Sequence, residues 1–299
     1  MGVEAFAGRA IAVLLGFGIG IDAVESIWLR SNAASPGLLH LERYPITRVR
    51  VGYALDAVQL ICAMCIITQP WWVLTIIASL VLVIVRLFGR LTAHPGRDGA
   101  DQMFVIVLVA ISLFSILPSN TAKQVCLLFI GAQAILCYSV AGLSKLSSPA
   151  WRDGIAVSGI LSTRIYGDRR LFQFLDGRPL LSRAIGWSVI AFECSVIPLV
   201  FAGVSGAILF VISGFVFHIG GAVVMRLYRF FWAMIATYPA LIYLSDFMAN
   251  RLSQHGIVTW QALAGGTLGL TLLGAAVIVA SHPAKPRVAR VARVGGNDG

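Results

Sequence analysis

The chain has 299 residues, of which 58% are hydrophobic and 12% charged, and its formal net charge is +10. Soluble domains usually carry about 25% charged residues, so this composition excludes an ordinary soluble enzyme and predicts an all-α, polytopic integral membrane protein. The basic residues lie at the ends of apolar runs and in the C-terminal tail. This distribution is typical of contacts with membrane lipids and argues against a nucleic-acid partner.

A membrane-spanning helix needs about 20 mostly apolar residues, and the sequence offers eight or nine such stretches. In chain order they are approximately 6–28, 51–68, 71–88, 103–117, 125–143, 185–202, 206–225, 230–244 and 258–280. The more polar segment near 150–183 keeps several apolar side chains, and we expect it to form helices at the membrane interface. Residues 1–284 are expected to form one transmembrane domain, followed by a basic, disordered tail at 285–299.

Successive loops differ in charge. Basic residues concentrate after the first, third, fifth and seventh apolar stretches and in the tail, whereas the intervening loops carry chiefly Lys123 and Arg251. Basic loops are retained on the cytoplasmic side of a membrane. With nine helices, the pattern predicts a multi-pass protein of the cell membrane with its N-terminus outside and its basic tail in the cytoplasm.

Ionisable side chains inside a membrane-spanning helix are costly, and they usually face a partner or a polar cavity. The predicted spans contain Asp22, Asp56, Glu193 and His218, and one of them ends at Lys145. Taken alone, each residue is explained equally well by a structural role, as an interfacial anchor or half of an internal ion pair, and by a functional one. Together they exceed what anchoring requires, and we interpret them as a shared polar chamber.

The stretch QAILCYSVAGLSKLSSPAWRDG, residues 133–154, carries the most chemical information. Its first half is apolar enough to cross a bilayer, and it ends at Lys145, a Ser-Ser-Pro break and a turn that contains Trp151. An amine at the end of a membrane helix can act as a base or can anchor that end. No His or Cys spacing in the chain fits a metal site, so no metal is predicted.

This stretch resembles the signature of the horizontally transferred transmembrane (HTTM) family, which includes vitamin K-dependent gamma-carboxylase. The residues that carry the likeness are Gln133, Tyr138, Ala141, Gly142, Lys145, Leu146 and the run Trp151-Arg152-Asp153-Gly154. Further likenesses follow in the family's order: Arg9, Gly16 and Asp22; Asp101-Gln102; Glu193 with Pro198; and Phe217-His218 with Met225 and Phe230. The likeness covers about residues 6–245.

The resemblance implies a membrane enzyme in which Lys145 is the base that deprotonates a reduced quinone, such as menaquinone or vitamin K. It also implies that His218 orients a bound intermediate. The other candidate site residues, which we expect to line the polar chamber and to bind substrate or cofactor, are Asp22, Asp56, Asp101, Gln102, Gln133, Tyr138, Trp151 and Glu193.

Two departures keep an alternative open. The chain leaves no room for the large β-rich extramembrane domain of the carboxylase, and its charge pattern places Lys145 on the cytoplasmic side, whereas the carboxylase acts on the opposite side. Short bacterial members of the family, which are similar to this chain in size, include a protein needed to mature a secreted sporulation-delaying toxin. The alternative is a non-catalytic membrane component for the maturation, export or immunity of a secreted peptide or small protein.

Overall fold

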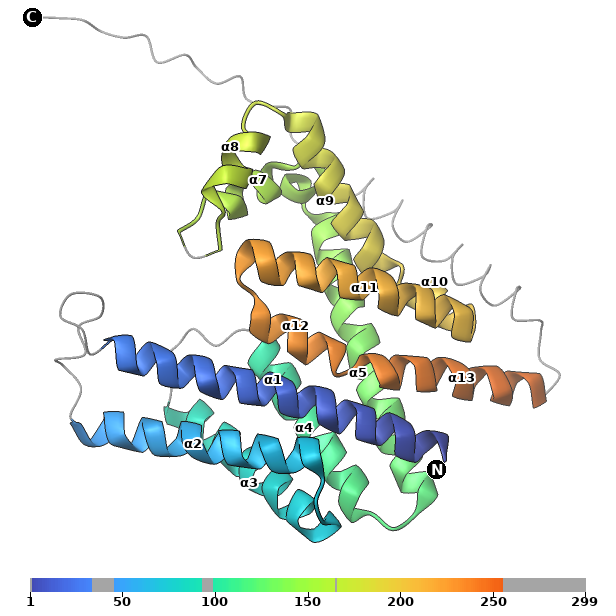
Figure 1. Cartoon of the computed structure of the whole chain (residues 1–299). Helices are drawn as coiled ribbons and strands as arrows, with labels where there is room; N and C mark the ends of the chain where they lie inside the picture. The colour runs from blue at the N-terminus through green and yellow to red at the C-terminus, as the bar shows by residue number, and fades with distance from the viewer. Residues whose placement is uncertain (1, 34–45, 93–98, 165, 255–299) are drawn as a thin grey trace, which may run out of the picture.

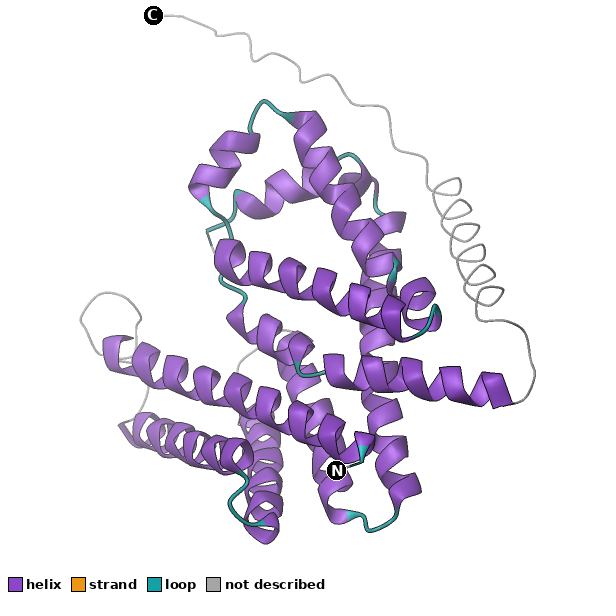
Figure 2. Ribbon diagram, turned by 45° about the vertical axis from the view of Figure 1, so that its right-hand side comes forward, coloured by secondary structure: helices purple, strands orange, loops and turns teal. Residues whose placement is uncertain are grey.

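The computed structural model describes residues 2–33, 46–92, 99–164 and 166–254, and within them every regular element is a helix (Figures 1 and 2). The prediction of an all-α protein is therefore confirmed. In chain order the helices are α1 (Val3–Ala33), α2 (Ile46–Thr68), α3 (Trp72–Thr92), α4 (Gly99–Ile116), α5 (Asn120–Ser147), α6 (Pro149–Arg152), α7 (Ile155–Leu161), α8 (Arg169–Leu175), α9 (Pro179–Cys194), α10 (Val196–Phe201), α11 (Val204–Met225), α12 (Tyr228–Ile235) and α13 (Tyr238–Gln254).

Seven segments of the described chain are long and apolar enough to cross a membrane: α1, α2, α4, α5, α9 with α10, α11, and α12 with α13. The third predicted stretch forms α3, whose apolar part, Trp72–Phe88, is shorter. Large apolar side chains such as Trp72 and Val223 are exposed on the helix surfaces, as is expected of a face that contacts lipid rather than water. The protein is therefore a multi-pass membrane protein. The ninth predicted stretch, 258–280, and the tail at 285–299 lie outside the described residues.

Two predicted spans are longer than expected and are broken by prolines. The stretch predicted at 185–202 is α9 followed by α10, and the stretch predicted at 230–244 is α12 followed by α13. In both, the first helix ends four residues before a proline, Pro198 or Pro239. Proline has no N–H group to donate to the carbonyl four residues earlier, so the helical ladder is interrupted at that point.

Helix α5 is the element against which much of the bundle packs. It contacts α4, α9 and α13, and in both Figures 1 and 2 it runs at a steep angle to α11 and α13. Its first half contributes Leu127, Ile130 and Ala134 to the main apolar core. Its second half adds Tyr138 to that core and then leads to the short helices beyond Ser147. Residues near position 145 therefore lie where the bundle meets these short helices.

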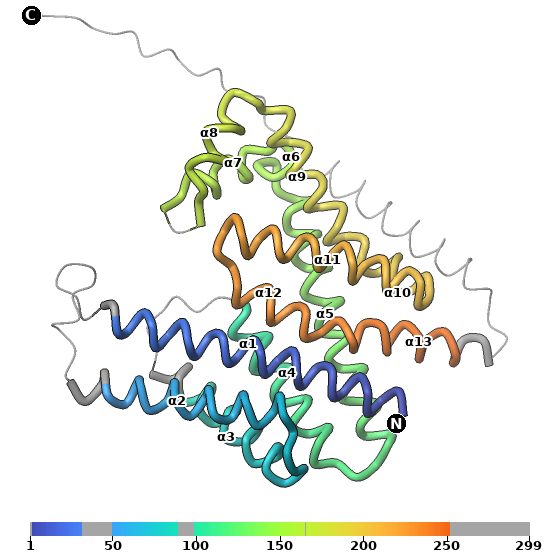
Figure 3. Tube along the Cα trace, viewed as in Figure 1, coloured from blue at the N-terminus to red at the C-terminus, as the bar shows by residue number. Residues whose placement is uncertain are grey.

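The cap consists of α6, α7 and α8 and lies at the C-terminal end of α5 (Figure 3). Pro149 disfavours a helical conformation at the preceding residue, and Ser148 is extended, with φ −84° and ψ 117°, which ends α5. Gly154 has φ +77°, and a β-carbon there would collide with the backbone of α9. The hydroxyl of Ser182 donates to the Gly154 carbonyl over 2.6 Å, which fixes the cap to α9. The helices expected in the segment 150–183 are thus present, although α9 already begins at Pro179.

Candidate functional site

Lys145, on the last turn of α5, forms an ion pair with Glu193 of α9. Its Nζ donates to both carboxylate oxygens of Glu193, over 2.7 and 2.8 Å. The side chains are 19% and 8% exposed, respectively. The Trp151 ring centroid lies 5.2 Å from the same Nζ, within the range of a cation–π contact. The lysine thus has a carboxylate on one helix and an indole from the cap as its neighbours.

The close approach of α5 and α9 depends on Gly142. A β-carbon at this position would lie 2.8 Å from Sγ and 3.0 Å from the backbone nitrogen of Cys194, so only glycine allows the present separation of the two helices. Tyr138, Gly142 and Lys145 are spaced by four and three residues and therefore lie on one face of α5. The local sequence Tyr-x3-Gly-x2-Lys builds this face.

A buried hydrogen-bonded chain of three side chains follows along the same face. The hydroxyl of Tyr138 lies 2.7 Å from Nε2 of His218 on α11 and 3.1 Å from the hydroxyl of Tyr238 on α13. When Nε2 is the unprotonated ring nitrogen, Tyr138 donates to it and can accept a hydrogen bond from Tyr238. Aromatic rings enclose the chain: Phe192, Phe210, Phe217 and Phe230.

The ion pair lies next to this hydrogen-bonded chain of Tyr138, His218 and Tyr238. Phe192 directly precedes Glu193, and its ring centroid lies 5.6 Å from that of Tyr138 and 6.5 Å from that of His218. Tyr138 and Lys145 also lie on one face of α5, so the two groups follow each other along the same helix. We therefore treat the two groups as one site and call it the inner site, which comprises Tyr138, Lys145, Trp151, Glu193, His218 and Tyr238.

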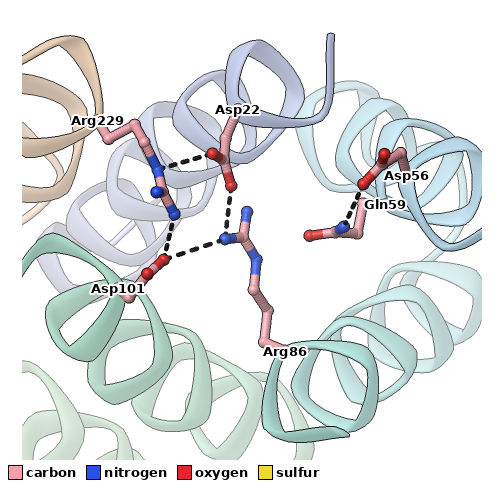
Figure 4. Close-up of polar contacts among 6 residues, drawn as sticks. All are labelled: Asp22, Asp56, Gln59, Arg86, Asp101 and Arg229. Carbon is pink, nitrogen blue, oxygen red and sulfur yellow. Dashed lines mark hydrogen bonds and ion pairs between the residues drawn. The ribbon is translucent and has the colours of Figure 1, made fainter. Parts of the chain in front are cut away.

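A second buried polar group, the charge ring, joins four other helices (Figure 4). Its members are Asp22 of α1, Arg86 of α3, Asp101 of α4 and Arg229 of α12. Nη1 of Arg86 lies 2.6 Å from Asp22 and 3.6 Å from Asp101, and Nε of Arg229 lies 2.7 Å from Asp22. Nη2 of Arg229 also contacts Asp101. Each carboxylate meets both guanidinium groups, so the ring is electrically neutral and cross-links its helices.

Asp56 of α2 lies beside the charge ring but has its own partners. Its carboxylate accepts a hydrogen bond from Nε of Arg30 over 2.8 Å and one from Nε2 of Gln59 over 3.5 Å. Figure 4 shows Gln59 between Asp56 and Arg86. Within the described residues, Nε and Nη2 of Arg86 have no hydrogen-bond partner.

The structure divides the predicted polar residues between these places. Tyr138, Lys145, Trp151, Glu193 and His218 come together in the inner site. Asp22 and Asp101 belong to the charge ring, and Asp56 pairs with Arg30. Gln102 is exposed and Gln133 is half-buried, and neither is a member of either group.

Three important residues were missed from the sequence: Arg86, Arg229 and Tyr238. Arg86 lies in the last two turns of α3 and Arg229 at the beginning of α12, and the loop-charge pattern treats both as charges that orient the protein. A signal was nevertheless present, because Asp22 and Asp101 needed cations at a similar depth. Tyr238 carried no such signal, since an aromatic residue in an apolar helix is usually a packing residue.

Within the described residues, no three His, Cys, Asp or Glu side chains converge to hold a metal ion. Comparisons with protein-family models, with curated proteins and with solved structures find no match for the chain.

Proposed function

We propose that the inner site is the proton-transfer centre of an HTTM-like membrane enzyme that acts on a lipophilic acid, with Lys145 as the base. The observation that carries this proposal is the two-pronged ion pair between Lys145 and Glu193. It lies at the end of a membrane-spanning helix, next to an indole and a buried histidine. Catalytic bases are commonly placed in such poorly hydrated, charge-paired surroundings.

The pair can take up a proton without leaving its place. Transfer of a proton from Nζ of Lys145 to Glu193 produces a neutral amine and a carboxylic acid, so that the net charge of the pair is unchanged. The amine can then accept a proton from a hydroxyl that approaches on its open side. Tyr138, Tyr238 and His218 supply fixed donors and acceptors next to the pair, and they can orient the oxygen that has lost its proton.

The residues present fit a reduced quinone. Trp151, which lies over Nζ of Lys145, offers an aromatic face against which a quinone ring can stack, and Lys145 offers a base for the ring hydroxyl. When bound, the quinol supplies an acidic hydroxyl and reducing electrons. Lys145 would bind and deprotonate that hydroxyl, Glu193 would hold the lysine in position, and the surrounding rings would limit access of water.

The first experiment measures protection of Lys145 from an amine-selective reagent in purified, detergent-solubilised protein, with and without reduced menaquinone. Lys123, at the other end of α5, is the internal control. We expect quinol to slow the labelling of Lys145 and to leave that of Lys123 unchanged. Glu193→Gln should abolish the protection, because Lys145 is no longer held. Equal labelling of the two lysines in all conditions would overturn the proposal.

One observation favours the alternative of a non-catalytic membrane component that serves a secreted peptide. Lys145 and Glu193 already satisfy each other, which is all that a structural cross-link requires. On this alternative, replacing both residues by methionine preserves every function of the protein, and quinol has no effect on the labelling of Lys145. If Lys145 is instead a catalytic base, that double variant loses function even where the fold is retained.

A further inference from the structure

An apolar groove runs between α1, α11 and α13. Its cavity volume is about 590 Å³, which lies within the range of small-molecule sites, about 300–1,000 Å³. Side chains that line it include Phe6, Leu14, Val211, Phe215, Ile235 and Ile242. The lining is almost entirely hydrocarbon, so the groove suits an alkyl or acyl chain.

A polar pocket of about 400 Å³ adjoins this groove at the beginning of α1 and the end of α13. Val3, Tyr243 and Asp246 line both cavities, so together they form one site with an apolar and a polar part. The polar part lies at the ends of membrane-spanning helices, where lipid headgroups are found.

The polar part carries charges of both signs. Oε1 of Glu4 accepts hydrogen bonds from Gln124 over 3.1 Å and from Tyr243 over 3.4 Å. Within the described residues, no hydrogen bond or ion pair engages the carboxylate of Asp246. Arg251 lies over the ring of Phe247, with its guanidinium carbon 5.4 Å from the ring centroid. The pocket thus contains two carboxylates and one guanidinium group.

We propose that this groove and pocket bind a phospholipid whose headgroup ends in a primary ammonium group. One acyl chain occupies the apolar groove, the phosphate lies beside Arg251, and the ammonium lies between Glu4 and Asp246. A guanidinium recognises phosphate well, and an ammonium forms charge-assisted hydrogen bonds with carboxylates. The inference goes beyond the proposed function and does not depend on it.

The charges discriminate among common lipids. A headgroup with only negative charge places that charge near two carboxylates and one guanidinium group, which is a net repulsive arrangement. A trimethylammonium headgroup carries the same charges as the proposed ligand but has no N–H group to donate. A comparison of how well lipids with primary-ammonium, trimethylammonium and purely anionic headgroups are retained therefore reports directly on the contacts with Glu4 and Asp246.

The test uses the full chain in neutral detergent with an equimolar mixture of phosphatidylethanolamine, phosphatidylcholine and phosphatidylglycerol that have identical acyl chains. Native mass spectrometry counts the lipids that stay bound. We expect phosphatidylethanolamine to be retained about tenfold over each of the others, as one additional charge-assisted hydrogen bond would give. Equal retention of the three lipids would overturn the proposal.

Two kinds of variant separate the parts of the site. Glu4→Gln with Asp246→Asn should keep the bound lipid but lose the preference for the primary ammonium, whereas Glu25→Gln, an exposed change elsewhere on α1, should keep the preference. Ala10→Trp fills the apolar groove and should reduce retention of all three lipids. A preference that persists in the Glu4/Asp246 double variant, or retention unaffected by Ala10→Trp, would contradict the assignment.

Discussion

Arg86 of α3 reaches Asp22 of α1 across 2.6 Å, and this contact joins α1 to a helix that packs chiefly against α2 and α4. Both side chains are buried, at 6% and 10% exposure. A buried cation of this kind is tolerated only with matched anions, because charge is expensive to remove from water. The charge ring therefore favours packing of α1, α3, α4 and α12 against one another. We expect its loss to destabilise the protein.

Arg86→Met leaves Asp22 and Asp101 with one guanidinium group in place of two. We expect it to lower the free energy of unfolding by about 3–5 kcal/mol, the usual effect of removing one partner of a buried ion pair. Thermal unfolding in detergent measures the effect. Arg170→Met removes an exposed arginine of the cap and serves as the control. Equal melting temperatures of the two variants would show that the charge ring contributes little to stability.

Lys145 and Glu193 invite a double-mutant cycle with methionine. Each single substitution leaves one buried charge without its partner, so each should destabilise the protein, while the double variant should return close to the wild-type stability. The same three proteins then separate structure from chemistry, because a catalytic Lys145 requires that the stable double variant show no quinol-dependent activity. Simple additivity of the two single effects would mean that the ion pair is not coupled energetically.

The helices were predictable because the hydropathy of consecutive residues can be calculated directly from the sequence, without knowledge of tertiary contacts. The stretch 206–225, for example, is apolar at nearly every position and forms most of α11. The breaks before Pro198 and Pro239 were not predicted, since both sides of each break are equally apolar. The rule that proline removes the hydrogen bond to the residue four positions earlier could have located both.

The inner site was partly predictable for a different reason. Tyr138 and Lys145 share a helix face by spacing alone, whereas the arrival of Glu193 and His218 from α9 and α11 depends on how distant helices pack. A single sequence does not encode that packing in any local pattern. Asp22 illustrates the limit, because its polarity indicated a buried partner correctly but gave no means to choose Arg86 from among the many arginines.

Tyr138→Phe removes the hydroxyl that lies between His218 and Tyr238 and adds no volume. Its two neighbours then lose a hydrogen-bond partner in a buried site, which usually costs about 1–3 kcal/mol. We expect that loss in chemical or thermal unfolding, together with weaker protection of Lys145 by quinol. Tyr228→Phe, at an exposed tyrosine of α12, should change neither measurement. Unchanged stability of Tyr138→Phe would show that the hydrogen bonds of Tyr138 contribute little to the stability of the fold.

Gly142→Ala tests the close approach that brings Lys145 to Glu193. The new methyl group would meet Sγ and the backbone nitrogen of Cys194 at 2.8 and 3.0 Å, so α5 and α9 must separate. We expect a loss of about 1–3 kcal/mol in unfolding free energy, as overpacking usually causes, and weaker protection of Lys145 by quinol because its ion pair is stretched.

Gly220→Ala is the matched control, since a β-carbon there meets nothing within 4 Å. Adding Cys194→Ala to Gly142→Ala removes the sulfur but not the backbone nitrogen and should restore part of the loss. If Gly142→Ala behaves like Gly220→Ala, the separation of the two helices does not control the inner site.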